Sequence, residues 1–328
     1  MPLIHGRLRA LMLLLASAAL VAAATTIPQT LDPPAHGATQ AVLSQRTVVT
    51  GTRPFQPTSY WNTRLGKAPR SPHSAAWIRD SLNSAHTQNY LKLVLGDWGM
   101  PVVRSHPSDP LNTVSANGRS IRVHIPARAR PMAADDAAIV IIDRSTDQVV
   151  GLQGARYANG HWTAIGMSRY HYQSNGIAGG LPGGRKANFG HRGVPASVQA
   201  VTKREVLRGK IRHRLEVYWW ETADRTPEGS SAYFPMTGSE SGKTGVVPEG
   251  AVIRLKPSVD LDALKLSPAA RVIARALQKY GAVVGDNSGT GNNLKLQANV
   301  DWSGILNKDS LRRIPWSDFV FVKGGYRP

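Results

Sequence analysis

The segment 248–289 constrains the fold of this chain most, because it contains the clearest helical pattern in the sequence. Ser267 can act as the N-cap of that helix, and Pro268 suits its first position, where a missing N–H group costs nothing. Apolar residues then recur at helical spacing as far as Tyr280, so one face of the helix is apolar. Gly281 is placed to end the helix in a left-handed conformation.

Two short apolar runs flank this helix and predict strands, 251–255 before it and 282–284 after it. The second run passes directly into a turn with glycine on both sides that carries Asp286 and Asn287. A carboxylate at the end of a buried strand is a favourable position for a functional site. The position alone does not specify a reaction.

Outside this segment the sequence favours strands and turns. Glycine (31 residues) and proline (22 residues) are frequent and regular helical patterns are sparse, which together favour a β-rich body. The run 210–221 alternates along its length, and the run 137–142 is almost continuously apolar, as in a strand buried on both faces or in a sandwich core. A chain of 328 residues is long enough to bury a large core.

The N-terminus has the pattern of a secretory signal peptide. Arg7 and Arg9 precede the apolar run 11–24, which ends in small residues and is shorter than the roughly 20 residues of a membrane span. The alternative is an uncleaved anchor. We expect a secreted, extracellular protein, either free or associated with the cell envelope. The expected organisation is a signal peptide over 1–24, a flexible linker over 25–53 and a single β-rich domain over 54–328.

Charge and cysteine content narrow the classes of partner and chemistry. The net charge of +19 favours an anionic partner outside the cell, a polysaccharide or another anionic cell-surface polymer, although such a charge can also serve solubility alone. Export makes nucleic acid an unexpected partner. The absence of cysteine excludes a thiol nucleophile and a thiolate metal site, and the ten histidines are scattered. We therefore expect neither a cofactor nor a metal.

Motifs in the C-terminal half are similar to a recurring pattern. They are Gly209-Lys210-Ile211-Arg212-His213-Arg214-Leu215, Ala276-Leu277 with Tyr280-Gly281, and Asp286-Asn287. These motifs resemble an uncharacterised family of exported bacterial proteins, of actinobacterial type, with a Gly-x-Ile-x-His-Ala-Leu strand motif and a later Tyr-Gly run leading to Asp-Asn. The resemblance covers roughly 135–322, places His213 at the motif histidine, and implies a β-sandwich or jelly-roll-like body with a few short helices.

The sequence departs from the family pattern at two places. The family often has Asp-x-His before the buried strand, where this chain has Asp135-Asp136-Ala137-Ala138. Arg214 replaces the small residue that follows the motif histidine. The resemblance implies a fold and gives no reaction.

One functional hypothesis is an enzyme that acts on extracellular or cell-wall polysaccharide, either a glycan hydrolase or a lyase. Both reactions need a paired acid and base, and a lyase also needs a cation for the uronate group. Aromatic rings can stack on sugars. The candidate catalytic residues are His213, Asp286 and Asp136. The candidate substrate-binding residues are Arg212, Trp162, Trp219 and Asn287.

The alternative is a non-catalytic protein that binds carbohydrate or cell wall. In that case His213 would be a core histidine bound to a backbone group, and Asp286 would stabilise its own turn. A serine hydrolase is disfavoured because no G-x-S-x-G motif is present. The enzyme hypothesis requires His213 and Asp286 to face one another in an open pocket. The hypothesis of a non-catalytic binding protein allows both residues to be buried in the core.

Overall fold

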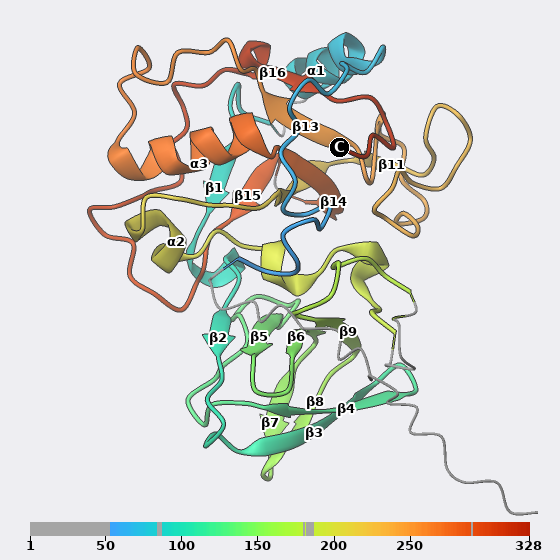
Figure 1. Ribbon diagram of the computed structural model, residues 1–328, viewed down its shortest axis with the longest axis vertical. Coiled ribbons are helices and arrows are strands. Elements are labelled where there is room, and N and C mark those ends of the chain that lie inside the picture. The colour runs from blue at the N-terminus through green and yellow to red at the C-terminus, as the bar shows by residue number, and fades with distance from the viewer. Residues whose placement is uncertain (1–52, 84–86, 180, 182–186, 290) are drawn as a thin grey trace, which may run out of the picture. The chain divides into compact units, whose positions relative to one another are not determined.

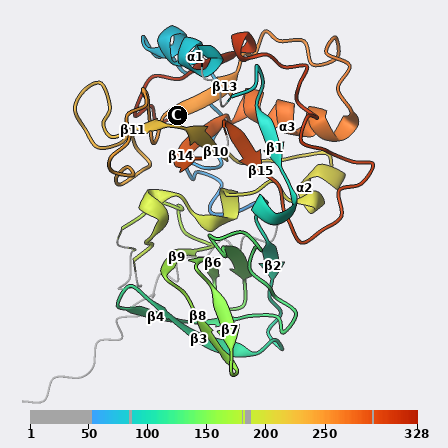
Figure 2. The same cartoon turned by 180° about the vertical axis from the view of Figure 1, so that it is seen from behind.

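The alternating run at 210–221 forms β10 (Leu215–Trp220), which lies inside a six-stranded sheet. It pairs in parallel with β14 (Ala282–Ser288), the strand that follows the predicted helix. The strand order is β1-β15-β10-β14-β13-β16, and Figures 1 and 2 show this sheet from its two sides. The other strands are β1 (Lys92–Val94), β13 (Val252–Leu255), β15 (Asn293–Lys295) and β16 (Phe319–Phe321).

The computed structural model describes residues 53–83, 87–179, 181, 187–289 and 291–328. The predicted signal peptide and the predicted linker as far as residue 52 lie outside these residues. The described residues all belong to one unit, Arg46–Pro328. None of the helices in this part of the chain has the length and apolar character that a membrane span requires.

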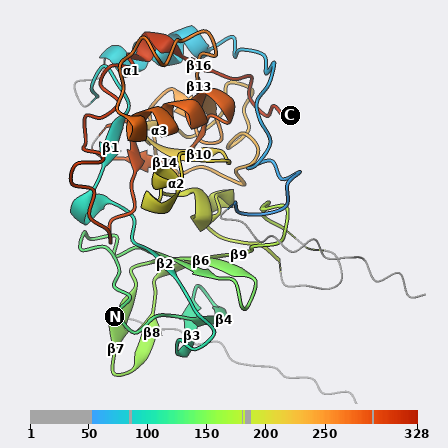
Figure 3. The ribbon, with the colours of Figure 1, turned by 60° about the vertical axis from the view of Figure 1, so that its left-hand side comes forward.

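The predicted helix is confirmed as α3 (Pro268–Lys279). The Ser267 hydroxyl accepts the N–H of Ala270 at 3.2 Å, and Gly281 has a φ of +70° just after the helix. Figure 3 shows α3 lying along the six-stranded sheet. Its buried face packs on apolar side chains of the sheet, and burial of each large apolar side chain contributes about 1.5–3 kcal/mol. The shared core includes Ile273, Leu277, Leu215, Val217 and Trp219.

Side chains alternate along each strand, so the two faces of this sheet differ in character. Leu215, Val217 and Trp219 belong to the core under α3, and the intervening Glu216 and Tyr218 lie on the opposite face. This opposite face carries the polar groups of the site described below.

A β-sandwich forms a second part of the fold. One sheet has the order β2-β5-β6-β9 and the other the order β4-β3-β8-β7, and Figure 3 shows them as separate layers. Apolar side chains from both sheets share one core, which includes Val114, Val123, Ile139, Ile141 and Val150. The strands are β2 (Val102–Arg104), β3 (Leu111–Ala116), β4 (Arg119–His124), β5 (Ile139–Asp143), β6 (Gln148–Gln153), β7 (Arg156–Ala158), β8 (His161–Thr163) and β9 (Gly166–His171).

The remaining regular elements are short. They are α1 (Ser74–Asn83), α2 (Lys203–Leu207), the strand pair β11 (Thr222–Ala223) and β12 (Val247–Pro248), and 3₁₀ turns at Gly96–Trp98, His191–Gly193, Ala196–Val198 and Trp316–Asp318. Sheets dominate the described chain, so the prediction of a mainly β fold with a few short helices is confirmed.

Candidate functional site

A cavity of about 590 Å³ lies against the polar face of the six-stranded sheet. Tyr218, Asp286 and Lys295 line it from that sheet, and Gln153 and Ser168 line it from the sandwich. A larger hollow, of about 960 Å³, lies among the loops around residues 300–313. The charged side chains on the wall of that hollow are exposed or half-buried, so it lacks the desolvated groups that chemistry requires.

A β-bulge aims Asp286 into the cavity. β10 and β14 are in register as far as Val217 and Val284, and Tyr218 then pairs with Asp286, so Gly285 is the extra residue. A Cβ atom at position 285 would lie 2.1 Å from Oε1 of Glu216. The bulge therefore needs glycine, because the Glu216 carboxylate occupies the space a side chain would fill.

His191 and Arg192 reach the cavity from a strained turn. The four residues 190–193 all have positive φ, with values of 94°, 42°, 45° and 108°. Left-handed backbone at a residue other than glycine costs about 1–3 kcal/mol, so His191 and Arg192 are held there by the surrounding structure. Gly190 permits the close approach of this turn to the sandwich, because a Cβ atom there would lie 2.6 Å from the carbonyl oxygen of Met167.

Glu216 connects His191 to Tyr218. Its fully buried carboxylate accepts the Tyr218 hydroxyl at 3.1 Å through Oε2 and lies 3.1 Å from the His191 Nε2 atom through Oε1. Burial disfavours the charged imidazole, but the hydrogen bond and the charge of Glu216 outweigh burial, so the pKa of His191 is raised. The Nδ1 atom of His191 makes no hydrogen bond with any described residue and is left for a substrate.

Arg192 forms ion pairs with both Asp286 and Glu249. Its Nε and Nη2 atoms donate to the buried Glu249 carboxylate at 2.9 and 3.2 Å, and Nη2 also donates to Oδ1 of Asp286. The other oxygen of Asp286, Oδ2, lies 3.9 Å from Nε2 of His191. The imidazole and this carboxylate therefore stand together on the cavity wall.

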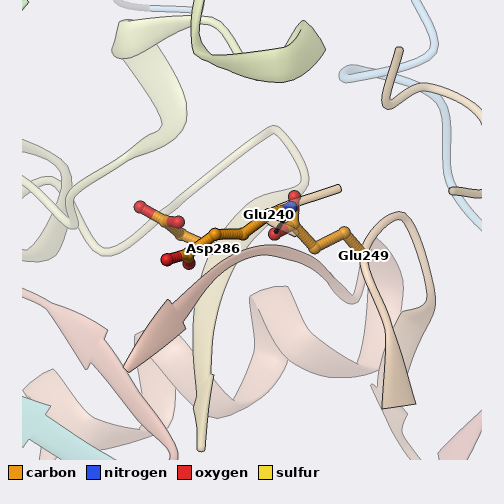
Figure 4. A group of neighbouring side chains, drawn as sticks. All are labelled: Glu240, Glu249 and Asp286. Atoms are coloured by element: carbon orange, nitrogen blue, oxygen red, sulfur yellow. Dashed lines mark hydrogen bonds between the residues drawn. The ribbon is translucent and has the colours of Figure 1, made fainter. Parts of the chain in front are cut away.

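Three carboxylates, those of Glu240, Glu249 and Asp286, lie close enough to be considered as metal ligands, within 4.8 Å of one another (Figure 4). The Arg192 guanidinium already lies between Glu249 and Asp286 and neutralises their negative charge, as a bound cation would. The Glu240 carboxylate lies 3.2 Å from the Lys243 ammonium, and the Glu240 backbone N–H donates to Glu249 at 3.0 Å. The donor set is therefore explained by an ion-pair network.

Lys295 and Asp136 bring opposite charges to the cavity without pairing. The Nζ atom of Lys295 lies 4.4 Å from the centre of the Tyr218 ring, and burial lowers its pKa although Asp136, Glu216 and Asp286 all act to raise it. Among the described residues, neither the Lys295 ammonium nor the Asp136 carboxylate has a hydrogen-bond partner. Both groups are therefore available to a ligand.

Of the residues predicted from sequence, the structure brings Asp286, Asn287 and Asp136 to this one cavity. His213 lies elsewhere, 1% exposed, with Nε2 at 2.8 Å from Glu205 and Nδ1 at 2.8 Å from the Arg214 carbonyl oxygen. The predicted pairing of His213 with Asp286 is therefore not what the structure shows. His213 takes the position of a satisfied core histidine because it precedes β10 on the side that faces the interior.

The three other predicted substrate contacts also lie away from the cavity. Trp219 is 1% exposed and packs edge-on against Trp316, because strand alternation turns it to the core with Val217. Trp162 is buried in the sandwich core, and Arg212 is exposed without lining the cavity.

Sequence reasoning missed most of the residues that the structure gathers here. They are His191, Arg192, Glu216, Tyr218, Lys295 and, at the rim, Trp98. One signal was available: Gly190 and Gly193 flank a charged pair, as glycines flank Asp286, and such glycines mark backbone that other residues rarely adopt.

The fold and the site thus define a mainly β protein with a histidine–carboxylate cluster in a polar cavity. Comparisons with protein-family models, with curated proteins and with solved structures found no match.

Proposed function

We propose that this protein is an exported enzyme that hydrolyses a glycosidic bond in an extracellular or cell-wall polysaccharide. One observation carries the proposal: His191 is held on strained backbone between the buried Glu216 carboxylate and Asp286, and His191 and Asp286 both line a polar cavity. Strained backbone of this kind clusters at active sites. Export is supported by the N-terminal pattern of charged, apolar and small residues.

The charges of the cluster assign the roles. The hydrogen bond and the charge of Glu216 raise the pKa of His191 and so favour the protonated imidazole, which serves as the general acid. Asp286, held by Arg192, serves as the general base. His191 gives the proton on its free Nδ1 atom to the leaving sugar oxygen as the carbon–oxygen bond breaks, the oxygen of water bonds to the sugar carbon, and the proton of that water passes to Asp286.

Hydrolysis is favoured over elimination by the charges on the wall. A lyase substrate carries a uronate carboxylate that a cation must neutralise, and Arg192 is already committed to Glu249 and Asp286. Lys295 is unpaired, but it interacts with the charges of Asp136, Glu216 and Asp286, which oppose a further carboxylate beside it. Three carboxylates line the cavity beside its cations, and they oppose an additional negative charge. They are Asp136, Glu240 and Asp286.

A non-catalytic binder of carbohydrate is the second candidate, since a polar cavity with aromatic residues also suits binding alone. The strained His191 turn favours catalysis, because binding by hydrogen bonds does not require an imidazole paired with a buried carboxylate. The positive charge of the chain would in either case draw it to anionic polymers of the cell surface.

Release of reducing ends from a panel of neutral and acidic polysaccharides tests the proposal. The parent protein is expected to cleave at least one of them, and His191→Asn to lose about 100-fold or more of that rate, as removal of a general acid does. His161→Asn, at an exposed histidine of β8, is the matched control and is expected to retain activity. Cleavage by the His191→Asn variant at the parent rate, or an unsaturated product that absorbs ultraviolet light, would contradict it.

A further inference from the structure

We propose that the cavity binds an uncharged sugar, with the sugar ring stacked on Trp98 and its hydroxyl groups held by Asp136 and Lys295. This inference rests on the proposed function and names its substrate class. The residues that carry it are the rim tryptophan, the two unpaired charges and the amide side chains of the same wall.

Trp98 is an exposed aromatic side chain without a partner. It is 49% exposed, lines the cavity and makes neither a ring contact nor a hydrogen bond with the rest of the described chain. Tyr157, similarly exposed at 52%, instead packs its ring against Trp162 at 5.3 Å. An apolar ring left open at the mouth of a polar cavity fits the apolar face of a sugar.

The backbone holds Trp98 firmly at the rim. The Gly99 N–H donates to Gly96 at 3.0 Å, and the Met100 N–H donates to the Leu296 carbonyl oxygen at 2.9 Å. A Cβ atom at Gly99 would lie 2.9 Å from the same Leu296 oxygen, so the turn is pressed against the end of β15. The turn that carries Trp98 therefore lies beside the end of β15, which carries Lys295, and both side chains can contact one ligand.

The other polar groups of the wall suit hydroxyl groups and not a charged substituent. Carboxylates accept and ammonium and amide groups donate, and a sugar hydroxyl does both. The amides on the wall are those of Asn117, Gln153, Gln199 and Asn287. An acidic sugar would instead bring its carboxylate among Asp136, Glu240 and Asp286, which carry the same charge.

The experiment measures binding separately from turnover. In the His191→Asn background, titration calorimetry compares neutral oligosaccharides (glucan, mannan, arabinan, galactan) with acidic ones of equal length (galacturonan, alginate). We expect a neutral series to bind and the acidic series to bind at least tenfold more weakly. Adding Trp98→Ala should weaken the neutral series by about tenfold, and Tyr157→Ala, the matched control, should leave it unchanged.

Each outcome decides between the two proposals. Stronger binding of the acidic series, no binding by any oligosaccharide, or no effect of Trp98→Ala would overturn the inference, and cleavage of a polysaccharide by the parent protein would leave the proposed function standing. Conversely, Trp98-dependent binding of a neutral sugar without any cleavage by the parent protein would support the inference and overturn the proposed hydrolase. Circular dichroism of each variant shows whether it is folded.

Discussion

Gly285 is the residue on which the arrangement of the site depends most directly. It is the extra residue of the β-bulge, and the space beside it is filled by Glu216. That carboxylate cannot move aside freely, because it is buried and bonded to both His191 and Tyr218. A glycine without a side chain is thus a condition for the orientation of the imidazole.

Gly285→Ala is therefore expected to impair activity more than folding. The methyl group displaces Glu216 and, with it, His191, and misplacement by about 1 Å can lower a rate about 100-fold. The cost in stability should be about 1–3 kcal/mol, typical of overpacking. Urea unfolding and the reducing-end assay measure the two effects.

Gly289→Ala is the matched control, because a Cβ atom there meets no neighbour within 4 Å. Its stability should stay within about 0.5 kcal/mol of the parent value. Equal effects of the two substitutions on stability would contradict the role given to Gly285.

The pH dependence of cleavage should follow His191. A general acid acts only when protonated, and the pKa of His191 is raised by Glu216 in spite of burial. Activity is therefore expected to fall as the pH rises through the raised pKa of His191. The pH profile of kcat/KM checks this, and a rate that increases as the imidazole loses its proton would contradict the assignment.

At the scale of elements, α2 and the residues before β10 are joined by Glu205. Its carboxylate completes the capping box of α2 with Thr202 and also lies 2.8 Å from Nε2 of His213. The capping box joins residues three positions apart, whereas the second contact forms only in the folded chain, where His213 packs beside Glu205. His213 thus stabilises an element junction.

Glu205→Gln should destabilise the protein by about 3–5 kcal/mol, because it leaves a buried histidine without its charged partner. Burial opposes both charges, but their interaction outweighs it, so the pKa of His213 is raised and that of Glu205 is lowered. The raised pKa of His213 contributes its full stabilisation of the folded protein at any pH below about 6.5, the pKa of histidine in the unfolded chain. The lowered pKa of Glu205 contributes its full stabilisation at any pH above about 4.3, the pKa of glutamate in the unfolded chain.

The difference in unfolding free energy between the parent and Glu205→Gln should therefore be largest between about pH 4.3 and 6.5. It should shrink as pH rises through the raised pKa of His213 and as it falls through the lowered pKa of Glu205. Chemical unfolding across this range measures the difference. Arg208→Gln, at an exposed residue after α2, is the control, and a pH-independent cost of Glu205→Gln would contradict the ion pair.

At the scale of the whole molecule, the chain is strongly basic and the cavity wall is not. Lysine and arginine number 40 against 21 acidic residues, whereas the wall carries three carboxylates beside Arg192, Lys295 and His191. Under the proposed function, the outer surface would attract an anionic polymer and the cavity would select the sugar.

Binding to an anionic cell-surface polymer such as teichoic acid should accordingly be sensitive to salt. It should weaken strongly between 0.05 and 0.5 M salt, since screening shortens to about 8 Å at 0.15 M. Binding of a neutral oligosaccharide should change little over the same range. Co-sedimentation with the polymer and calorimetry with the oligosaccharide measure the two, and polymer binding that persists at high salt would contradict the surface attraction.

Much of the fold followed from local patterns. The caps of α3, the alternation of β10 and the buried strand β5 each depend on residues a few positions apart, and these signals persist in the folded chain. The glycines on either side of Asp286 marked an unusual backbone there. The predicted turn was wrong, because β14 continues through Asp286 to Ser288 and the irregularity is a bulge at Gly285.

The sequence by itself therefore determined the mainly β character, the main helix and one carboxylate of the site. Only the tertiary structure decided that carboxylate's partners. Arg192 and Asp286 are 94 positions apart, and they meet because a left-handed turn approaches the bulged strand β14. Such a meeting depends on which strands pair and in what register, and no local pattern encodes either. The same packing placed His191 in the cavity and sealed His213 in the interior.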